Sequence, residues 1–124
     1  MATTIVRNIA EVLDEIGGFE KTYSYSGNLA VSTGTERFYA FSAATCSEIN
    51  AYIGTAPVGS DVIFNVKKNG STVDTITISD GNTSSTNSST SSYSKGDYLT
   101  VDITQIGSST AGADLKINFI FTKV

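Results

Sequence analysis

The stretch DVIFNVKKNGSTVDTITI, residues 61–78, decides the fold class of this chain. Asn69-Gly70 lies between two alternating apolar runs, which is the strongest short-range signal for a two-residue hairpin, because both central residues of that turn need a positive φ. A three-residue loop would set Phe64 against Asp74, so the two-residue turn is preferred. The register that it predicts pairs Val66 with Val73, Phe64 with Thr75 and Val62 with Thr77.

Strand-like runs with a period of two continue on both sides of this hairpin. Before it they cover residues 19–26, 36–42 and 47–53, and after it residues 98–106 and 114–122. The run between them, residues 80–97, is mostly Ser, Thr, Asn and Gly, so we expect a long loop with one weak edge strand at residues 88–93. Eight short strands predict an all-β fold, an eight-stranded antiparallel jelly-roll sandwich over residues 19–124.

The first 18 residues have a helical pattern and form a predicted N-terminal arm. Asn8 and Glu11 have the spacing of a capping box and Gly17-Gly18 gives a stop, so a short amphipathic helix is expected over residues 9–16. Two interpretations stay open: the helix covers one end of the sandwich, or its apolar stripe binds a partner. The stripe consists of Ile5, Ile9, Val12, Leu13 and Ile16.

Composition argues against several classes of function. The net charge is −4 and the eight basic residues are scattered, which does not give the positive stripe that nucleic-acid binding needs. The chain begins without a signal peptide and has no apolar run long enough to cross a membrane, so we expect synthesis in the cytoplasm and no membrane contact. There is no histidine, and Cys46 is the only cysteine, so neither an enzyme nor a cofactor is expected.

A calcium site and a sugar site are two minor candidates for ligand binding. Four loop-like carboxylates have the oxygen ligands that calcium prefers, but their spacing matches no calcium loop, so solvated carboxylates are expected and no metal is predicted. They are Asp61, Asp80, Asp97 and Asp102. Four tyrosines have rings that stack on sugars, although tyrosine in strands more often lines the rim of a core. They are Tyr39, Tyr52, Tyr93 and Tyr98.

The predicted hairpin register also gives an apolar patch. Ile63 and Ile76 fall opposite each other on the face that should meet solvent, and Ile106 and Ile120 occupy polar-facing positions that we expect to lie in line with them. Exposed apolar patches mark interfaces, so Ile63 and Ile76 are candidate partner-binding residues. The alternative is that the second sheet or the N-terminal helix covers them.

Three segments carry a family resemblance: GTERFYAF (residues 34–41), IGTAPVGSDVIFNVKKNGSTV (residues 53–73) and KGDYLTVDITQIGSSTAGADLKI (residues 95–117). Together they resemble a small jelly-roll or β-sandwich module of tailed-phage virion proteins. Such modules occur as head decoration (cement) proteins and as tip modules of tails and fibres. The resemblance covers residues 24–122 and leaves the arm outside, and because the module has no catalytic motif it assigns no role to single residues.

The resemblance implies a structural function in a bacteriophage virion. We expect a capsid decoration protein, made in the host cytoplasm, that forms a homotrimer on the head surface and bridges subunits of the major capsid protein. A protein that binds only the expanded shell stabilises it by its own binding free energy. The alternative is a tail or fibre module that binds a host receptor or glycan.

Overall fold

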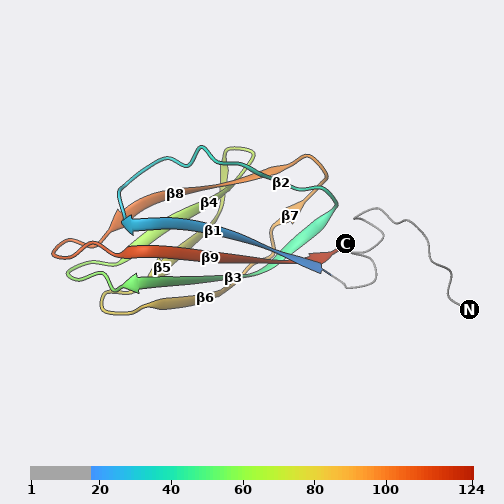
Figure 1. The fold of residues 1–124 in the computed structure, drawn as a ribbon. Helices are drawn as coiled ribbons and strands as arrows, with labels where there is room; N and C mark the ends of the chain where they lie inside the picture. Colours follow the sequence, from blue (N-terminus) through green and yellow to red (C-terminus); the bar gives the residue numbers. More distant parts are fainter. Residues whose placement is uncertain (1–17) are drawn as a thin grey trace, which may run out of the picture.

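The computed structural model describes residues 18–124, which form a sandwich of two antiparallel β-sheets (Figure 1). One sheet has the strand order β1-β9-β3-β6, with β7 also paired to β3, and the other has the order β2-β8-β4-β5. The strands are β1 (Gly18–Asn28), β2 (Phe38–Tyr39), β3 (Ala44–Thr55), β4 (Val62–Lys68), β5 (Ser71–Ile78), β6 (Ser84–Ser88), β7 (Ser92–Tyr93), β8 (Tyr98–Ile106) and β9 (Ala113–Lys123).

The predicted all-β sandwich is confirmed, but the predicted count of eight strands is wrong. The Ser/Thr-rich run forms two short strands, β6 and β7, in place of one weak edge strand, and each pairs separately with β3. Between them the hydroxyls of Ser89 and Ser91 both donate to Asp74 Oδ2, at 2.8 and 2.9 Å. These bonds tie the edge of the first sheet to β5 of the second. The predicted helix and the rest of residues 1–17 lie outside the described residues.

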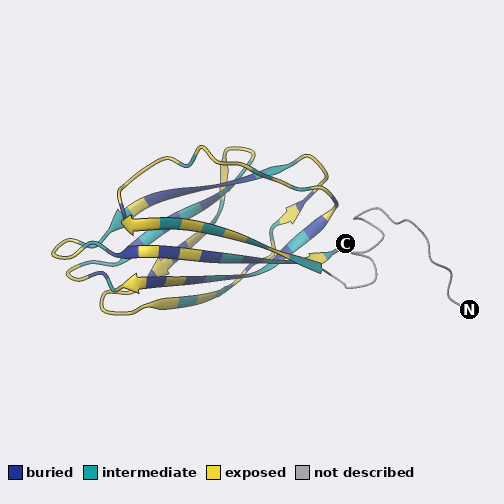
Figure 2. Ribbon diagram, viewed as in Figure 1, coloured by how far each residue is buried: buried dark blue, intermediate teal, exposed yellow. Residues whose placement is uncertain are grey.

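The core lies between the two sheets, where alternate residues of each strand point inward (Figure 2). In β9, Leu115, Ile117, Phe119 and Phe121 are buried while the residues between them are exposed or half-buried. This is the period-two pattern that the sequence of β9 predicts. Because β9 has neighbours on both sides in its sheet, its inner face forms the centre of the core.

The hairpin has the predicted two-residue turn but not the predicted register. Asn69 and Gly70 have φ values of 51° and 89°, and Lys68 pairs with Ser71. A bulge then shifts the pairing by one residue, so Val66 pairs with Asp74. The expected pairs Val66–Val73, Phe64–Thr75 and Val62–Thr77 are therefore wrong, and the observed ones are Phe64–Ile76 and Val62–Ile78.

This shift changes which side chains of β5 face the core. Ile76 and Ile78 are 2% and 0% exposed, whereas Thr75 and Thr77 face solvent. Ile63 pairs with Thr77 and so lies on the opposite face from Ile76. The expectation that Ile63 and Ile76 share a solvent-facing position was wrong because a one-residue slip inverts every side chain beyond it.

Candidate functional site

The predicted partner-binding residues do not form one surface in the described chain. The stripe of Ile5, Ile9, Val12, Leu13 and Ile16 lies outside the described residues. Ile76 is buried in the core, and the half-buried Ile63 is opposite Thr77 on one side and Gln105 on the other. Ile106 packs against the core, and Ile120 belongs to the other sheet. The expected apolar patch is therefore absent from the part of the chain that the structure describes.

An aromatic cluster marks the end of the sandwich at which the described chain begins. Gly18 pairs with Thr122, close to the C-terminus, as Figure 1 shows. A Cβ at Gly18 would lie 2.1 Å from Phe121 O, so only glycine fits here without a backbone shift. The Phe19 ring stacks on the Phe121 ring with 4.8 Å between the ring centroids, and it packs against the Phe41 ring with 4.9 Å between the centroids. The first strand therefore begins beside Phe41, which is 38% exposed.

A cleft lies on the outer side of the second sheet, where the connection between β1 and β2 runs along the edge of β8. Ser32 and Ile103 exchange two backbone hydrogen bonds of 2.9 Å, which hold this connection along β8. Gly34 lies so close to β8 that a Cβ would be 2.0 Å from Val101 O. The side of β8 that would otherwise meet solvent is thus covered, and Thr100 and Asp102 are 7% and 8% exposed.

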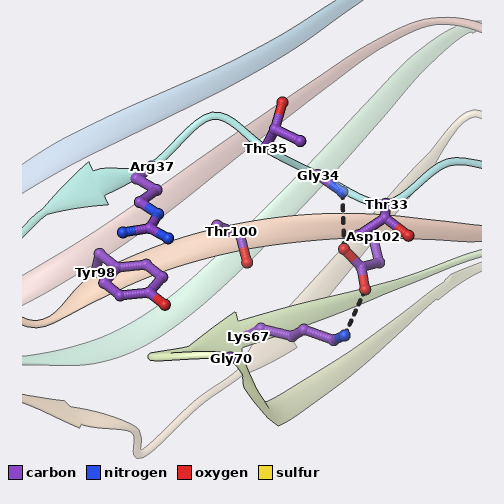
Figure 3. Close-up of a pocket in the computed structure, with 9 residues that line it drawn as sticks. All are labelled: Thr33, Gly34, Thr35, Arg37, Lys67, Gly70, Tyr98, Thr100 and Asp102. Carbon is purple, nitrogen blue, oxygen red and sulfur yellow. Dashed lines mark hydrogen bonds and ion pairs between the residues drawn. The ribbon is translucent and has the colours of Figure 1, made fainter.

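Asp102 connects the two walls of this cleft (Figure 3). Its Oδ1 accepts the Gly34 N–H at 2.8 Å, and its Oδ2 lies 2.6 Å from the Lys67 ammonium. Burial opposes ionisation of this carboxyl, but the hydrogen bonds from Lys67 and Gly34 outweigh it and hold its pKa below the usual range. The cleft floor therefore carries a carboxylate whose charge is already compensated by Lys67.

Arg37 follows Gly34 in the same connection, across the cleft from Lys67, and packs with two tyrosines. Its guanidinium carbon lies 4.1 Å from the centroid of the Tyr98 ring, and its Nη1 donates to the Tyr39 hydroxyl at 3.1 Å. The two rings are 5.6 Å apart and tilted by 52°. Tyr39 is 54% exposed, so one aromatic face next to the arginine remains open to solvent.

The cleft holds about 260 Å³, and both polar and apolar groups line it. The lining residues are Thr33, Gly34, Thr35, Arg37, Lys67, Gly70, Tyr98, Thr100 and Asp102. An arginine fork, hydroxyl groups and an adjacent aromatic ring can together bind a small ligand that carries both an anion and hydroxyls.

Of the four tyrosines considered for sugar stacking, the structure brings together only Tyr39 and Tyr98. Tyr52 lies on the outer face of the first sheet and is 48% exposed. Tyr93 is buried, and burial raises the pKa of its hydroxyl, which has no hydrogen-bond partner in the described structure. Sequence reasoning missed Arg37 and Lys67. The available signal was the i, i+2 spacing of Arg37 and Tyr39, which puts both on one face of an extended segment.

The four candidate carboxylates are also dispersed. The Asp80 N–H donates to Asp61 Oδ1 at 2.8 Å, so these two close one loop end. Asp97 accepts from Asn69 at the hairpin tip, and Asp102 lies in the cleft. Within residues 18–124, no three acidic, cysteine or histidine side chains gather as a metal site would require.

Cys46 is buried on the inner face of β3 at 1% exposure, as expected for a small apolar residue. Burial raises the pKa of its thiol to about 11, so the reactive thiolate is disfavoured at neutral pH.

Residues 18–124 contain no helix that is long and apolar enough to span a membrane.

Comparison with known proteins does not add a relative to these observations: no family model matches the chain, and no curated protein matches its sequence.

Proposed function

We propose that this protein is a bacteriophage virion structural protein, a capsid decoration (cement) protein that binds the outside of the expanded head. In this proposal it assembles as a trimer, contacts the major capsid protein and bridges neighbouring shell subunits. It stabilises the expanded shell by mass action. A ligand that binds only this state stabilises it by about 2.7 kcal/mol when the free ligand concentration is 100 times the dissociation constant.

The observation that carries the proposal is the strand order of the two sheets. The orders β1-β9-β3-β6 and β2-β8-β4-β5 are those of two interleaved Greek keys when β6 and β7 are taken as one interrupted strand. We infer a jelly-roll topology on this basis, the architecture of many viral shell proteins. The resemblance to phage virion modules over residues 24–122 supports the same assignment.

The proposed contact to the shell is the N-terminal arm. The first described strand is fixed at Gly18 beside an aromatic cluster. An apolar stripe on a short helix is suited to a groove on a partner. The residues proposed to make this contact are Ile5, Ile9, Val12, Leu13 and Ile16. A role for Ile63 is retained only as a peripheral contact, and Ile76 is not available because it is buried.

The test is the number and position of copies in a purified particle, measured by electron microscopy. Hundreds of copies on the head are expected, and a few copies at the tail would instead support the alternative, a tail or fibre module that binds a host receptor or glycan.

The arm has its own test with expanded capsids. The full chain carrying Ile9→Ser and Leu13→Ser should lose at least tenfold in capsid affinity, because apolar contacts are removed, while Thr3→Ser should bind as the unaltered chain does. Circular dichroism checks that both variants keep the sandwich. Undiminished binding of the double variant would remove the arm from the proposal.

A further inference from the structure

We propose that the cleft between residues 32–37 and the tip of the β4–β5 hairpin binds an acidic sugar, with Arg37 taking the sugar carboxylate. This goes beyond the proposed function and does not depend on it, because a virion protein can present this face to solvent wherever it is attached. The inference rests on the juxtaposition of one uncompensated arginine with hydroxyls and an open tyrosine ring.

The first step concerns the two cations of the cleft, which differ in their partners. Lys67 is neutralised by Asp102 at 2.6 Å. Arg37 has no carboxylate partner among residues 18–124, and it is held instead by the Tyr98 ring and the Tyr39 hydroxyl. Stacking uses the flat face of the guanidinium, and one of its five N–H donors goes to Tyr39. The remaining donors along its edge are free to bind a carboxylate in the bidentate manner.

The second step is that the orientation of Arg37 is set before any ligand arrives. Figure 3 shows its guanidinium lying against the Tyr98 ring at the mouth of the cleft. Tyr98 itself is fixed, since its backbone N–H donates to Asn69 Oδ1 at 3.0 Å and Asn69 Nδ2 donates to Asp97 at 3.0 Å. A cation that is already ordered loses less conformational entropy on binding than a free surface arginine does.

The third step is that the rest of the cleft is also preformed. Asp102 accepts from Gly34 on one wall and pairs with Lys67 on the other, so one carboxylate holds both walls at a fixed separation. Gly34 and Gly70 have no side chains and leave the backbone accessible on either side. The volume of about 260 Å³ is below that of pockets for drug-sized ligands and suits a single small ring.

The fourth step selects the ligand class. Thr33, Thr35 and Thr100 add hydroxyls that both donate and accept, which matches the hydroxyls of a sugar ring. The half-exposed Tyr39 ring beside Arg37 offers an apolar face for the C–H groups of a sugar. A phosphate would be expected to gather several cations or backbone N–H groups, whereas here one free guanidinium faces a hydroxyl-rich wall.

The test is titration of the isotope-labelled full chain, followed by amide chemical shifts, at low salt. The probes are methyl β-D-glucuronide and N-acetylneuraminic acid, with methyl β-D-glucoside as the neutral match and sodium acetate and inorganic phosphate as simple anions. At least one acidic sugar should shift the amides of Gly34, Thr35 and Tyr98, and its affinity should exceed that for the glucoside and for both simple anions by at least tenfold. A response to one acidic sugar and not the other would tell which class of acidic glycan fits.

Variants then locate the site. Arg37→Gln should reduce the affinity for the acidic sugar by at least tenfold, and Arg37→Lys should reduce it less, since the charge remains but the fork is lost. Lys116→Gln removes an exposed cation on the other sheet and should leave binding unchanged. Thermal unfolding checks that each variant is folded.

Three results would overturn the proposal. They are the absence of any shift with either acidic sugar, unchanged binding in the folded Arg37→Gln variant, and equal affinity for acetate or phosphate, which would reduce the site to simple anion binding. The position of the protein in the particle does not enter this experiment, so its failure is distinguishable from failure of the proposed decoration function.

Discussion

Asp102 is the residue on which the geometry of the cleft depends. It lies on the outward side of β8, yet it is only 8% exposed, because the connection from β1 runs beside it along the edge of β8 and Lys67 of β4 lies on its other side. It satisfies the Gly34 N–H and the Lys67 ammonium at once. Its loss would leave the half-buried Gly34 N–H and the partly exposed Lys67 ammonium without their acceptor, and a polar group that is shielded from water and unpaired destabilises a protein more than a hydrogen bond stabilises it.

The Asp102→Asn variant tests this role through pH. In the folded protein the pKa of Asp102 lies below its ordinary value of 3.8, so the ionised carboxyl contributes stability above that pH. The contribution is lost as pH falls through the lower folded-state pKa. Urea unfolding should therefore show the variant to be less stable by about 1–3 kcal/mol at pH 7, and the difference should shrink progressively below about pH 4.

The control for this measurement is Glu20→Gln, an exposed carboxylate on the outer face of the first sheet. Its effect on the free energy of unfolding should stay within about 0.5 kcal/mol at either pH. A difference between Asp102→Asn and the unaltered chain that does not change with pH would mean that the charge of Asp102 contributes nothing.

At the scale of single elements, the sequence of the hairpin predicts its turn but not its register. Asn69-Gly70 predicts the turn because the two-residue turn has a local backbone requirement, and the structure confirms it. The bulge at Val73 is a compromise between that turn and the core. Without it, Thr75 and Thr77 would face inward and Ile76 and Ile78 would face solvent. The sequence reflects this conflict, because Val73 is at an odd position in the period-two pattern of the strand whereas the two isoleucines are at even positions.

The bulge predicts opposite consequences for two isoleucines of one hairpin. Ile76→Ala removes a side chain that is 2% exposed and should lower the free energy of unfolding by about 2–5 kcal/mol, because a cavity remains in the core. Ile63→Ala changes the polar outer face and should cost less than about 1.5 kcal/mol. Urea unfolding of the two variants measures both, and similar losses would contradict the bulged register.

For the whole molecule, composition and alternation were sufficient to predict an all-β sandwich but not the cleft. Most strands of the two sheets have an alternating pattern in a local run of residues, so they can be read along the chain, whereas β6 and β7 lie in a Ser/Thr-rich run without that pattern. The cleft instead joins Arg37, Lys67 and Asp102, which come from three separate segments and meet because the β1–β2 connection and β4 lie on either side of β8. No periodicity encodes which segments become neighbours of β8, which is why the sequence predicted tyrosines and carboxylates without grouping them.

The whole molecule also contains one internal reporter of its opening, the thiol of Cys46. It lies in β3, which pairs with β9 on one side and with β6 and β7 on the other, so exposing it requires most of the first sheet to separate. Burial raises its pKa to about 11 in the closed fold, so the folded chain holds the thiol in its unreactive protonated form near neutral pH. Labelling of Cys46 should therefore follow global unfolding and not local fluctuation.

Labelling with an aromatic disulfide reagent at pH 8 tests this expectation. The folded chain should react at least about a thousandfold more slowly than the urea-unfolded chain, since a domain of ordinary stability is open for a smaller fraction of the time than that. Ile76 lies on the other sheet, yet Ile76→Ala should speed the reaction about tenfold for each 1.4 kcal/mol of stability that it removes. If Ile76→Ala leaves the labelling rate unchanged, β3 opens by itself, and the two sheets do not unfold as one cooperative unit.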